Sequence, residues 1–282
     1  MPELPEVETV RRGLQPHLEG AQLDRVVLNR PDLRFPLPDR MVERLTGATI
    51  TRLARRAKFL VAETDRDERL VMHLGMSGRF TIETPDERAL EPGKFEHARL
   101  TDPRHDHVEF FTQAGTRIVF NDPRRFGYMQ MFTPGEDPFR DLGPEPLSNA
   151  FNGAHLHGAV RLRRSPMKSL LLDQSVIAGL GNIYVCEALF RAGVSPRRLG
   201  LNLGRARAER LAVAIREVLI AAIEAGGSTL RDYANADGGL GYFQHSFDVY
   251  GREGGACRRC DTPVLRLVQS GRSTFFCAKC QR

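Results

Sequence analysis

The sequence predicts a multidomain α+β protein, in which an antiparallel β domain with an N-terminal helix precedes a helical domain and a small metal-binding module. Three observations support this prediction. Short β-prone segments recur roughly every ten residues in the first half of the chain, which is typical of antiparallel β domains. An apolar helical segment follows in the second half, and four of the five cysteines lie within the last 26 residues.

The chain opens with Met1-Pro2-Glu3-Leu4-Pro5-Glu6, which predicts a helix whose first residue is Pro5. Its first turn would be acidic and its last turn basic, as the helix dipole prefers, with Glu6 and Glu8 followed by Arg11 and Arg12. The buried stripe of this helix would be Val7, Val10 and Leu14.

The same stretch also predicts chemistry, because Pro2 is small enough for Met1 to be trimmed and a secondary amine to be exposed. An α-amino group titrates near ~8 and a lysine near ~10.4, so at neutral pH roughly a tenth of such an amine is unprotonated. This form is nucleophilic, and Glu3 and Glu6 would place carboxylates close to it for proton transfer. A purely structural helix is the alternative.

The segments that follow are rich in β-branched and apolar residues and are separated by glycine, proline and aspartate, a pattern that predicts an antiparallel sandwich or barrel. They are Leu23–Leu28, Thr49–Leu53, Phe59–Glu63, Arg69–Leu74, Arg79–Glu83, Ala98–Thr101, His107–Thr112, Thr116–Asn121 and Tyr128–Phe132.

Three loops of this β domain carry unusual side chains. Arg55-Arg56-Ala57-Lys58 places three cations at a strand junction, either in a solvated loop or at a binding site. Met76, within residues 73–78, and Phe126, within residues 121–127, are large apolar side chains among turn residues. Such side chains usually belong to the core, but beside positive charge they can insert as wedges between base pairs.

The second half of the chain begins after residues 133–147, which are rich in proline and glycine and indicate a domain boundary. Residues 177–184 predict a helix end, a glycine turn and a new helix near Asn182, whose backbone N–H groups would suit a phosphate. Gly226–Gln244 predicts a long loop that could close over a ligand. Leu203–Ala225 predicts a helix with Leu211, Ile215, Val218, Leu219, Ala222 and Ile223 in the core.

The cysteine pattern predicts a metal site. Cys257 and Cys260 form one pair, Cys277 and Cys280 form another, and sixteen residues separate the pairs. This spacing is typical of a tetrahedral zinc ion held by four cysteines. Two disulfides are the alternative.

The residues between the cysteine pairs predict a β-hairpin formed by Val264–Val268 and Ser273–Phe276, with Arg272 at its turn. Zinc would replace the core that so short a segment cannot build. The fifth cysteine, Cys186, is expected to be buried in a helix without a role in the site.

Composition limits the possible partners. The hydrophobic content is 41%, and no apolar run reaches the ~18 residues of a membrane span, so we expect a cytoplasmic protein without a membrane partner. Residues 1–150 carry 22 basic and 25 acidic side chains, whereas residues 151–282 carry 19 basic and 10 acidic ones and suit a polyanion. Only four of the 41 basic residues are lysines, and these are candidates for sites that need a compact ammonium, which a planar guanidinium cannot replace; they are Lys58, Lys94, Lys168 and Lys279.

Together these motifs resemble the formamidopyrimidine-DNA glycosylases, which excise oxidised purines such as 8-oxoguanine from duplex DNA. The resemblance implies an N-terminal antiparallel β-sandwich with an N-terminal helix, and a C-terminal helix–two-turn–helix domain that ends in a four-cysteine zinc-finger β-hairpin. The implied divisions are residues 1–133, a linker at 134–147, then 148–248 and 249–282. The motifs that carry the resemblance are residues 2–8, 73–78, 121–127, 181–184, 241–244 and 271–275, with the four clustered cysteines.

The resemblance also implies a role for each candidate residue. Pro2 would attack C1′ of the damaged nucleotide and form a Schiff base, Glu3 would assist opening of the sugar ring, and Lys58 would engage the damaged site. Strand cleavage by β,δ-elimination would follow from the same intermediate. Three residues would fill the gap in the duplex and face the orphaned cytosine, namely Met76, Arg124 and Phe126. Phosphates beside the lesion would be held by Lys168, Asn182 and Arg272, and residues 226–244 overlap the loop that covers the extruded base.

The implied partner is damaged double-stranded DNA, bound by a monomer at the nucleoid with one structural zinc ion. Two other functions stay open: the same scaffold acting on oxidised pyrimidines, and a non-catalytic zinc-finger DNA-binding protein. Leu4 favours the purine branch, since the pyrimidine branch typically has glycine there. The non-catalytic alternative leaves Pro2, Glu3 and Lys58 unexplained. The chain departs from the family pattern at Cys186 and at Asp261, where glycine usually follows the second cysteine.

Overall fold

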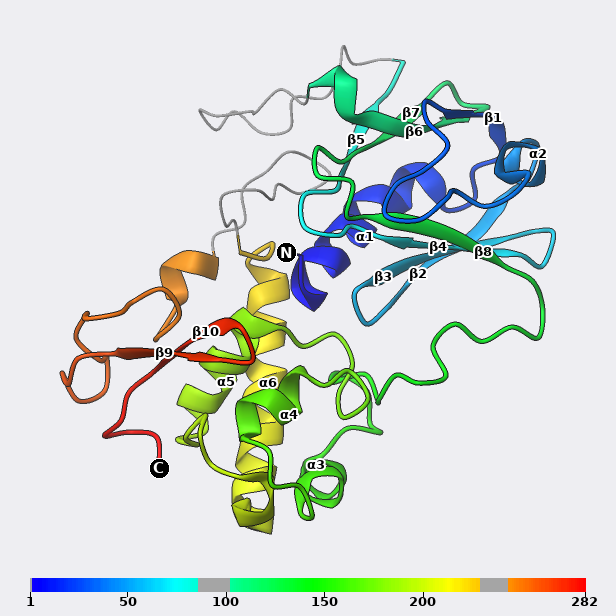
Figure 1. Cartoon of the computed structure of the whole chain (residues 1–282). Helices are drawn as coiled ribbons and strands as arrows, with labels where there is room; N and C mark the ends of the chain where they lie inside the picture. Colours follow the sequence, from blue (N-terminus) through cyan, green and yellow to red (C-terminus); the bar gives the residue numbers. More distant parts are fainter. Residues whose placement is uncertain (1, 86–101, 229–242) are drawn as a thin grey trace. The chain divides into compact units, whose positions relative to one another are not determined.

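The computed structural model describes residues 2–85, 102–228 and 243–282. The chain divides into two compact units, the first made of Met1–Pro138 with Ala225–Tyr242 and the second of Phe139–Glu224 with Phe243–Arg282 (Figure 1). The polypeptide therefore leaves the first unit after Pro138 and returns to it at Ala225. Within the described ranges, every helix is too short or too polar to cross a lipid bilayer.

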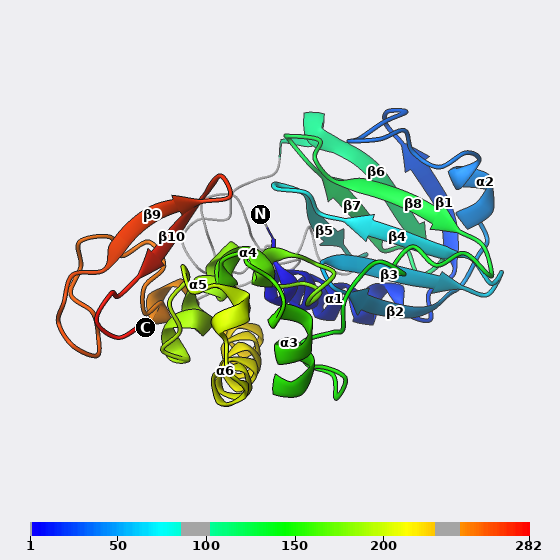
Figure 2. The ribbon, with the colours of Figure 1, turned by 60° about the horizontal axis from the view of Figure 1, so that its bottom comes forward.

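The first unit contains two four-stranded antiparallel sheets, with strand orders β1-β6-β7-β5 and β2-β3-β4-β8 (Figure 2). The strands are β1 (Leu23–Leu28), β2 (Ile50–Arg56), β3 (Phe59–Thr64), β4 (Arg69–His73), β5 (Arg79–Glu83), β6 (Asp106–Thr112), β7 (Arg117–Asn121) and β8 (Tyr128–Phe132). The helices are α1 (Leu4–Leu18), α2 (Met41–Leu45) and the 3-10 turn η1 (Pro103–His105). The strands agree with the predicted segments to within one residue at each end, except that β2 continues to Arg56, three residues beyond the predicted Leu53. The predicted segment Ala98–Thr101 lies outside the described residues.

One apolar core joins α1 to both sheets. Val10 of α1, Leu60 of β3 and Phe120 of β7 are fully buried in the same cluster. In β3, β4, β5, β6 and β7 alternate side chains point into this cluster, as a sheet with one buried face requires. The predicted N-terminal sandwich with an N-terminal helix is confirmed.

The helix α1 runs from Leu4 to Leu18, so it starts one residue earlier and ends later than predicted. Arg11 and Arg12 do not close it but pair in mid-helix with Glu8, at 2.9 Å and 3.0 Å. The helix continues past them because its apolar stripe extends to the buried Leu18. The predicted stripe itself is confirmed, since Val7, Val10 and Leu14 are all buried.

The second unit is helical and ends in a two-stranded antiparallel hairpin. Its elements are α3 (Gly153–Val160), α4 (Met167–Leu172), α5 (Asn182–Arg191), the 3-10 turn η2 (Gly200–Asn202), α6 (Arg205–Glu224), the 3-10 turn η3 (Phe243–Ser246), β9 (Leu265–Gln269) and β10 (Arg272–Phe276). The predicted start of a helix at Asn182 is confirmed, as is the hairpin, although Arg272 pairs with Gln269 as the first residue of β10 and does not lie in the turn. All six predicted core residues of α6 are buried.

The predicted helix end at Ile177 is wrong, because α4 already ends at Leu172. Asp173 stops it: its carboxylate accepts hydrogen bonds from the backbone N–H and the hydroxyl of Ser175, at 3.0 Å and 2.6 Å. This local turn competes with the helix for the same backbone groups.

Candidate active site and metal centre

Three loops of the first unit meet at one end of the β2-β3-β4-β8 sheet. The strand register pairs Arg56 with Phe59, Phe59 with His73, and His73 with Tyr128. The turn before Phe59, the loop after His73 and the loop before Tyr128 therefore leave the sheet at the same end. These loops carry Lys58, Met76 and Phe126 respectively, so the fold brings together candidates that are far apart in sequence.

The N-terminus of α1 points toward this end of the sheet. The Glu19 carboxylate accepts a hydrogen bond from the Leu53 N–H at 2.8 Å, and the Glu8 carboxylate accepts one from Nε of Arg55 at 3.3 Å. The helix therefore runs antiparallel to β2, and its first residues lead toward the turn that contains Lys58. Pro2 and Glu3 are both buried there.

A buried carboxylate fixes the residue that follows the terminal proline. Glu3 and Glu6 form a reciprocal capping box, in which Glu6 Oε2 accepts the Glu3 N–H at 2.8 Å. Glu6 Oε1 accepts hydrogen bonds from the N–H and the hydroxyl of Ser228, both at 2.9 Å. The sequence suggested Glu6 as a proton-transfer group, but through these contacts Glu6 links the start of α1 to the chain at Ser228. Most of the predicted covering loop, residues 229–242, lies outside the described residues.

His73, which the sequence analysis did not select, is a neutral hydrogen-bond donor at the same end of the sheet. Burial, together with the positive charges of Lys58 and Arg34, lowers its pKa to about 4. Its Nδ1 accepts the Gly75 N–H at 3.0 Å, so the proton of the neutral ring is on Nε2. The signal available in the sequence was its place directly before a glycine-containing loop.

Phe126 is not a core residue, because 43% of its surface is exposed. The Arg124 guanidinium lies 4.8 Å from the centroid of its ring, a cation–π contact that places positive charge beside an exposed apolar group. Met76 is half-buried on the neighbouring loop. The two apolar side chains are thus presented on loops, as a wedge would require.

In the second unit, three candidate residues converge on the hairpin. Lys168 is fully buried, and its Nζ donates to the Ser273 carbonyl at 2.9 Å and to Oγ1 of Thr274 at 2.6 Å. The Nδ2 of Asn182, the first residue of α5, donates to the same carbonyl at 3.0 Å. Arg272 directly precedes Ser273 and is exposed, so the two donors hold the strand that presents it.

Glu187 is a buried acid beside these residues that the sequence analysis did not select. It is fully buried in α5 and accepts the N–H groups of Asp248, Val249 and Tyr250 at 2.8, 3.0 and 2.8 Å. Burial raises the pKa of this carboxyl, and the three donors oppose that effect. Tyr250, held in this way, has its hydroxyl 3.4 Å from Nδ2 of Asn182. A lone acid in an apolar helix was the signal in the sequence.

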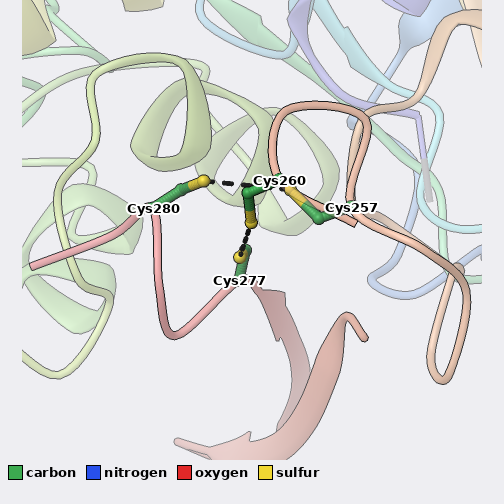
Figure 3. A group of neighbouring side chains, drawn as sticks. All are labelled: Cys257, Cys260, Cys277 and Cys280. Atoms are coloured by element: carbon green, nitrogen blue, oxygen red, sulfur yellow. Dashed lines mark hydrogen bonds between the residues drawn. The ribbon is translucent and has the colours of Figure 1, made fainter. Parts of the chain in front are cut away.

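The four clustered cysteines form a metal centre (Figure 3). Their sulfurs all lie within 4.8 Å of one another, with Cys257 and Cys280 at 3.9 Å and Cys260 and Cys277 at 3.5 Å. Zinc–sulfur bonds of about 2.3 Å in a tetrahedron place sulfurs about 3.8 Å apart. A disulfide needs about 2.05 Å, so the alternative of two disulfides does not fit. Burial and the neighbouring sulfurs raise the pKa of Cys280 to about 12, and only a bound cation would let all four ionise.

Replacing a zinc ligand should release the metal and unfold the hairpin. We expect Cys260→Ser to reduce bound zinc well below one ion per chain, because three thiolates and a hydroxyl form a much weaker site. Mass spectrometry of the metal content measures this. Cys186→Ala is the matched control, since Cys186 is buried outside the tetrad, and it should keep one ion. Equal zinc content in both variants would contradict the assigned ligands.

Asp261 keeps the backbone conformation that usually belongs to glycine. Its φ is +58°, and its N–H donates to the Cys257 carbonyl at 2.9 Å, so the turn beneath the metal is preserved at a conformational cost. We expect Asp261→Gly to raise the free energy of unfolding of the zinc-loaded chain by about 0.5–1 kcal/mol. Asp261→Ala should lower it, because alanine tolerates this region less well. Urea unfolding of both variants measures these free energies. A higher free energy of unfolding in Asp261→Ala would contradict a strained backbone at this turn.

Three family models match the chain: the formamidopyrimidine-DNA glycosylase N-terminal domain at residues 1–129, the formamidopyrimidine-DNA glycosylase H2TH domain at residues 142–234, and the zinc finger found in FPG and IleRS at residues 254–282. The chain is 57% identical over 289 residues to the formamidopyrimidine-DNA glycosylase of Ruegeria pomeroyi, and both sequences are covered completely. The four cysteines lie inside the matched zinc finger, which therefore holds one structural zinc ion.

Two solved structures are similar over nearly the whole chain. The MutM (Fpg) protein of Thermus thermophilus is 42% identical with a TM-score of 0.83, and 99% of this chain and 98% of that chain are covered. A mutant of the Lactococcus lactis Fpg protein, in complex with DNA that contains Fapy-dG, is 32% identical with a TM-score of 0.86, and both chains are covered completely.

Proposed function

This chain belongs to the formamidopyrimidine-DNA glycosylase family, whose members act on damaged DNA, and from this premise we propose that it removes oxidised purines from double-stranded DNA and then cleaves the strand. The substrates are 8-oxoguanine and formamidopyrimidines paired in duplex DNA. One observation carries the proposal: Pro2-Glu3, Lys58, Met76 and Phe126 converge at one end of a single sheet. The Fapy-dG in the DNA bound by the Lactococcus relative supports this substrate class.

The proposed chemistry starts at the unprotonated nitrogen of Pro2, once Met1 has been removed. Its lone pair forms a bond to C1′ of the damaged nucleotide while the glycosidic bond breaks, and the base leaves with that electron pair. The nitrogen then loses its proton and forms a double bond to C1′ as the ring oxygen O4′ departs. Glu3 supplies the proton that O4′ needs, as a general acid.

The resulting iminium is cationic at every pH, because its nitrogen carries no proton. It therefore acidifies the C2′ proton of the opened sugar, and loss of that proton expels the 3′ phosphate. Loss of a second proton, from C4′, expels the 5′ phosphate. Base removal and strand cleavage by β,δ-elimination thus share the nitrogen of Pro2.

The damaged nucleotide has to leave the duplex before its C1′ can be reached, at a cost of a few kcal/mol. Met76 and Phe126 offset this cost by filling the vacated space, and Arg124 faces the orphaned cytosine. The exposed ring of Phe126 and its contact with Arg124 support these roles. Lys58, whose positive charge acts on His73, engages the damaged nucleotide beside the nucleophile.

The second unit holds the phosphates beside the lesion. Asn182 begins α5, whose first N–H groups and dipole favour a phosphate, and Arg272 is exposed on the hairpin. Lys168 is the third proposed phosphate ligand; it is buried, and its Nζ donates to the carbonyl of Ser273, the residue after Arg272. The excess of basic residues in residues 151–282 supports this role of the second unit. The enzyme works as a cytoplasmic monomer on the DNA of the nucleoid.

Borohydride trapping tests this function. Incubation of the processed chain with duplex DNA that contains 8-oxoguanine opposite cytosine should give a covalent adduct, because borohydride reduces the iminium to a stable amine. A panel with thymine glycol and undamaged DNA separates the alternatives. A stronger adduct with thymine glycol would support the pyrimidine branch, and binding without any adduct would support a non-catalytic DNA-binding protein.

A further inference from the structure

We propose that Ser77 and Asp122 form a buried brace that joins two loops, residues 74–78 and 122–127, into one rigid wedge. The brace makes filling of the gap and reading of the opposite base a single event. This inference rests on the proposed function, in which Met76 fills the gap and Arg124 faces the opposite base. Ser77 and Asp122 touch no DNA in this scheme, and they are positioning residues that act through the loops.

The brace consists of one carboxylate and one hydroxyl, both withdrawn from solvent. Ser77 is 5% exposed and Asp122 is 0% exposed, and Oγ of Ser77 donates to Oδ1 of Asp122 at 2.6 Å. The Arg124 N–H donates both to this Oδ1 and to Oγ of Ser77, each at 3.3 Å. The second carboxylate oxygen, Oδ2, accepts the Gly127 N–H at 2.8 Å. One side chain thus fixes both ends of the segment that carries Phe126.

The backbone of Asp122 is itself anchored to the sandwich. Its N–H donates to the His105 carbonyl at 3.0 Å, and its carbonyl lies 2.9 Å from Nε2 of His107. The same carbonyl accepts the Arg125 N–H at 3.1 Å, which closes the turn. The Asp122 carboxylate is therefore held at a fixed position relative to the sheet, and its hydrogen bond holds Ser77 there as well.

The two loops also touch through their backbones. Gly75 has a φ of +63°, and a Cβ placed on it would lie 2.3 Å from the Gly127 nitrogen and 2.3 Å from the carbonyl carbon of Phe126. Only a glycine allows this approach. The brace and the backbone contact thus join the loops on two sides, with Met76 and Phe126 carried outward from the junction.

Joining the loops has a consequence for recognition. A hydrogen bond to a buried carboxylate is stronger than a neutral one, and a surface ordered before binding loses less conformational freedom on binding. With the loops joined, Met76 cannot enter the gap unless Arg124 reaches the opposite base. With the loops separated, each would move alone, and the gap would be filled opposite any base.

Amide hydrogen exchange of the free protein tests the coupling without DNA. Ser77→Ala should speed exchange at Gly127 and Arg124 of the partner loop by roughly tenfold or more, although the Gly127 N–H bonds to Asp122 and not to Ser77. Thr64→Ala is the matched control, because Thr64 is also 5% exposed and bonds to the Glu68 carbonyl at the opposite end of the sheet. Faster exchange confined to residues 74–78 would overturn the brace.

The opposite-base preference tests the functional part. The ratio of single-turnover excision rates of 8-oxoguanine opposite cytosine and opposite adenine should narrow by roughly tenfold in Ser77→Ala and in Asp122→Asn. The ratio should narrow no further in the double variant than in either single variant, because both substitutions break the same hydrogen bond. Thr64→Ala should keep the ratio of the unaltered chain. A ratio preserved in all variants, with both rates lowered equally, would reduce the pair to a structural role and overturn the proposal.

These two measurements separate this inference from the proposed function. If the unaltered chain excises no 8-oxoguanine, the proposed function fails, and hydrogen exchange still decides whether the loops are coupled. If the chain excises 8-oxoguanine and the brace variants keep both their exchange protection and their preference, only the brace fails.

Discussion

Retention of Met1 is expected to abolish the borohydride-stabilised adduct with DNA that contains 8-oxoguanine. The nitrogen of Pro2 would then be part of a peptide bond, and an amide nitrogen has no lone pair available for attack on C1′. We expect the adduct yield and the strand cleavage rate to fall by at least about 10³-fold, because both activities use this nitrogen in the proposed mechanism. A chain extended by a few residues before Met1 would provide the blocked form, and denaturing electrophoresis after borohydride treatment would measure the adduct.

Pro2→Gly is the matched control for the blocked chain. Glycine also permits removal of Met1 and leaves a terminal amine, although a primary one. This variant should still form an adduct, at a reduced rate, because a primary amine also condenses with C1′. Full trapping by the extended chain would show that another amine, such as Lys58, is the nucleophile.

Glu3→Gln is expected to slow excision of 8-oxoguanine by roughly 10²–10⁴-fold, the usual range for loss of a general acid. Glutamine has nearly the same size and keeps an oxygen that can accept the hydrogen bond at the start of α1, but it cannot deliver a proton to O4′. Glu3 is only 3% exposed, so water does not easily replace it. Single-turnover excision at saturating enzyme measures the effect on chemistry apart from binding.

Glu43→Gln controls for the loss of a carboxylate from the same unit. Glu43 lies in α2, where it pairs with Arg40 at 2.5 Å on the surface, and its replacement should change the excision rate by less than about twofold. The thermal midpoints of both variants should match that of the unaltered chain. A Glu3→Gln enzyme with an undiminished rate would remove Glu3 from the mechanism.

The local parts of the fold were predictable because local sequence determines them. Strand positions follow from alternating apolar residues between turn residues, and the metal centre follows from the spacing of Cys257, Cys260, Cys277 and Cys280. The extent of α1 was less predictable, because Arg11 and Arg12 suit a helix end equally well as a helix middle. Their pairing with Glu8 and the burial of Leu18 decided in favour of the longer helix.

The polar contacts that position the candidate site were not predictable in this way. Glu6 meets Ser228, which is 222 positions away, and Ser77 meets Asp122, which is 45 positions away. No spacing rule links such pairs, since only the path of the chain brings them together. The sequence did supply the types of group that take part, because a buried acid must find donors. It did not supply the identity of those donors.

The contact between Glu6 and Ser228 also bears on when the first unit can finish folding during synthesis. The first unit takes its last segment from Ala225 onward, so most of the second unit must leave the ribosome before the first can close. A chain released early would carry Pro2 and the strands of the sandwich without the partner that Glu6 requires. The surroundings of the N-terminus are thus completed only after the helices α3 to α6 of the second unit have been synthesised, and a fragment that ends before Ser228 lacks this contact.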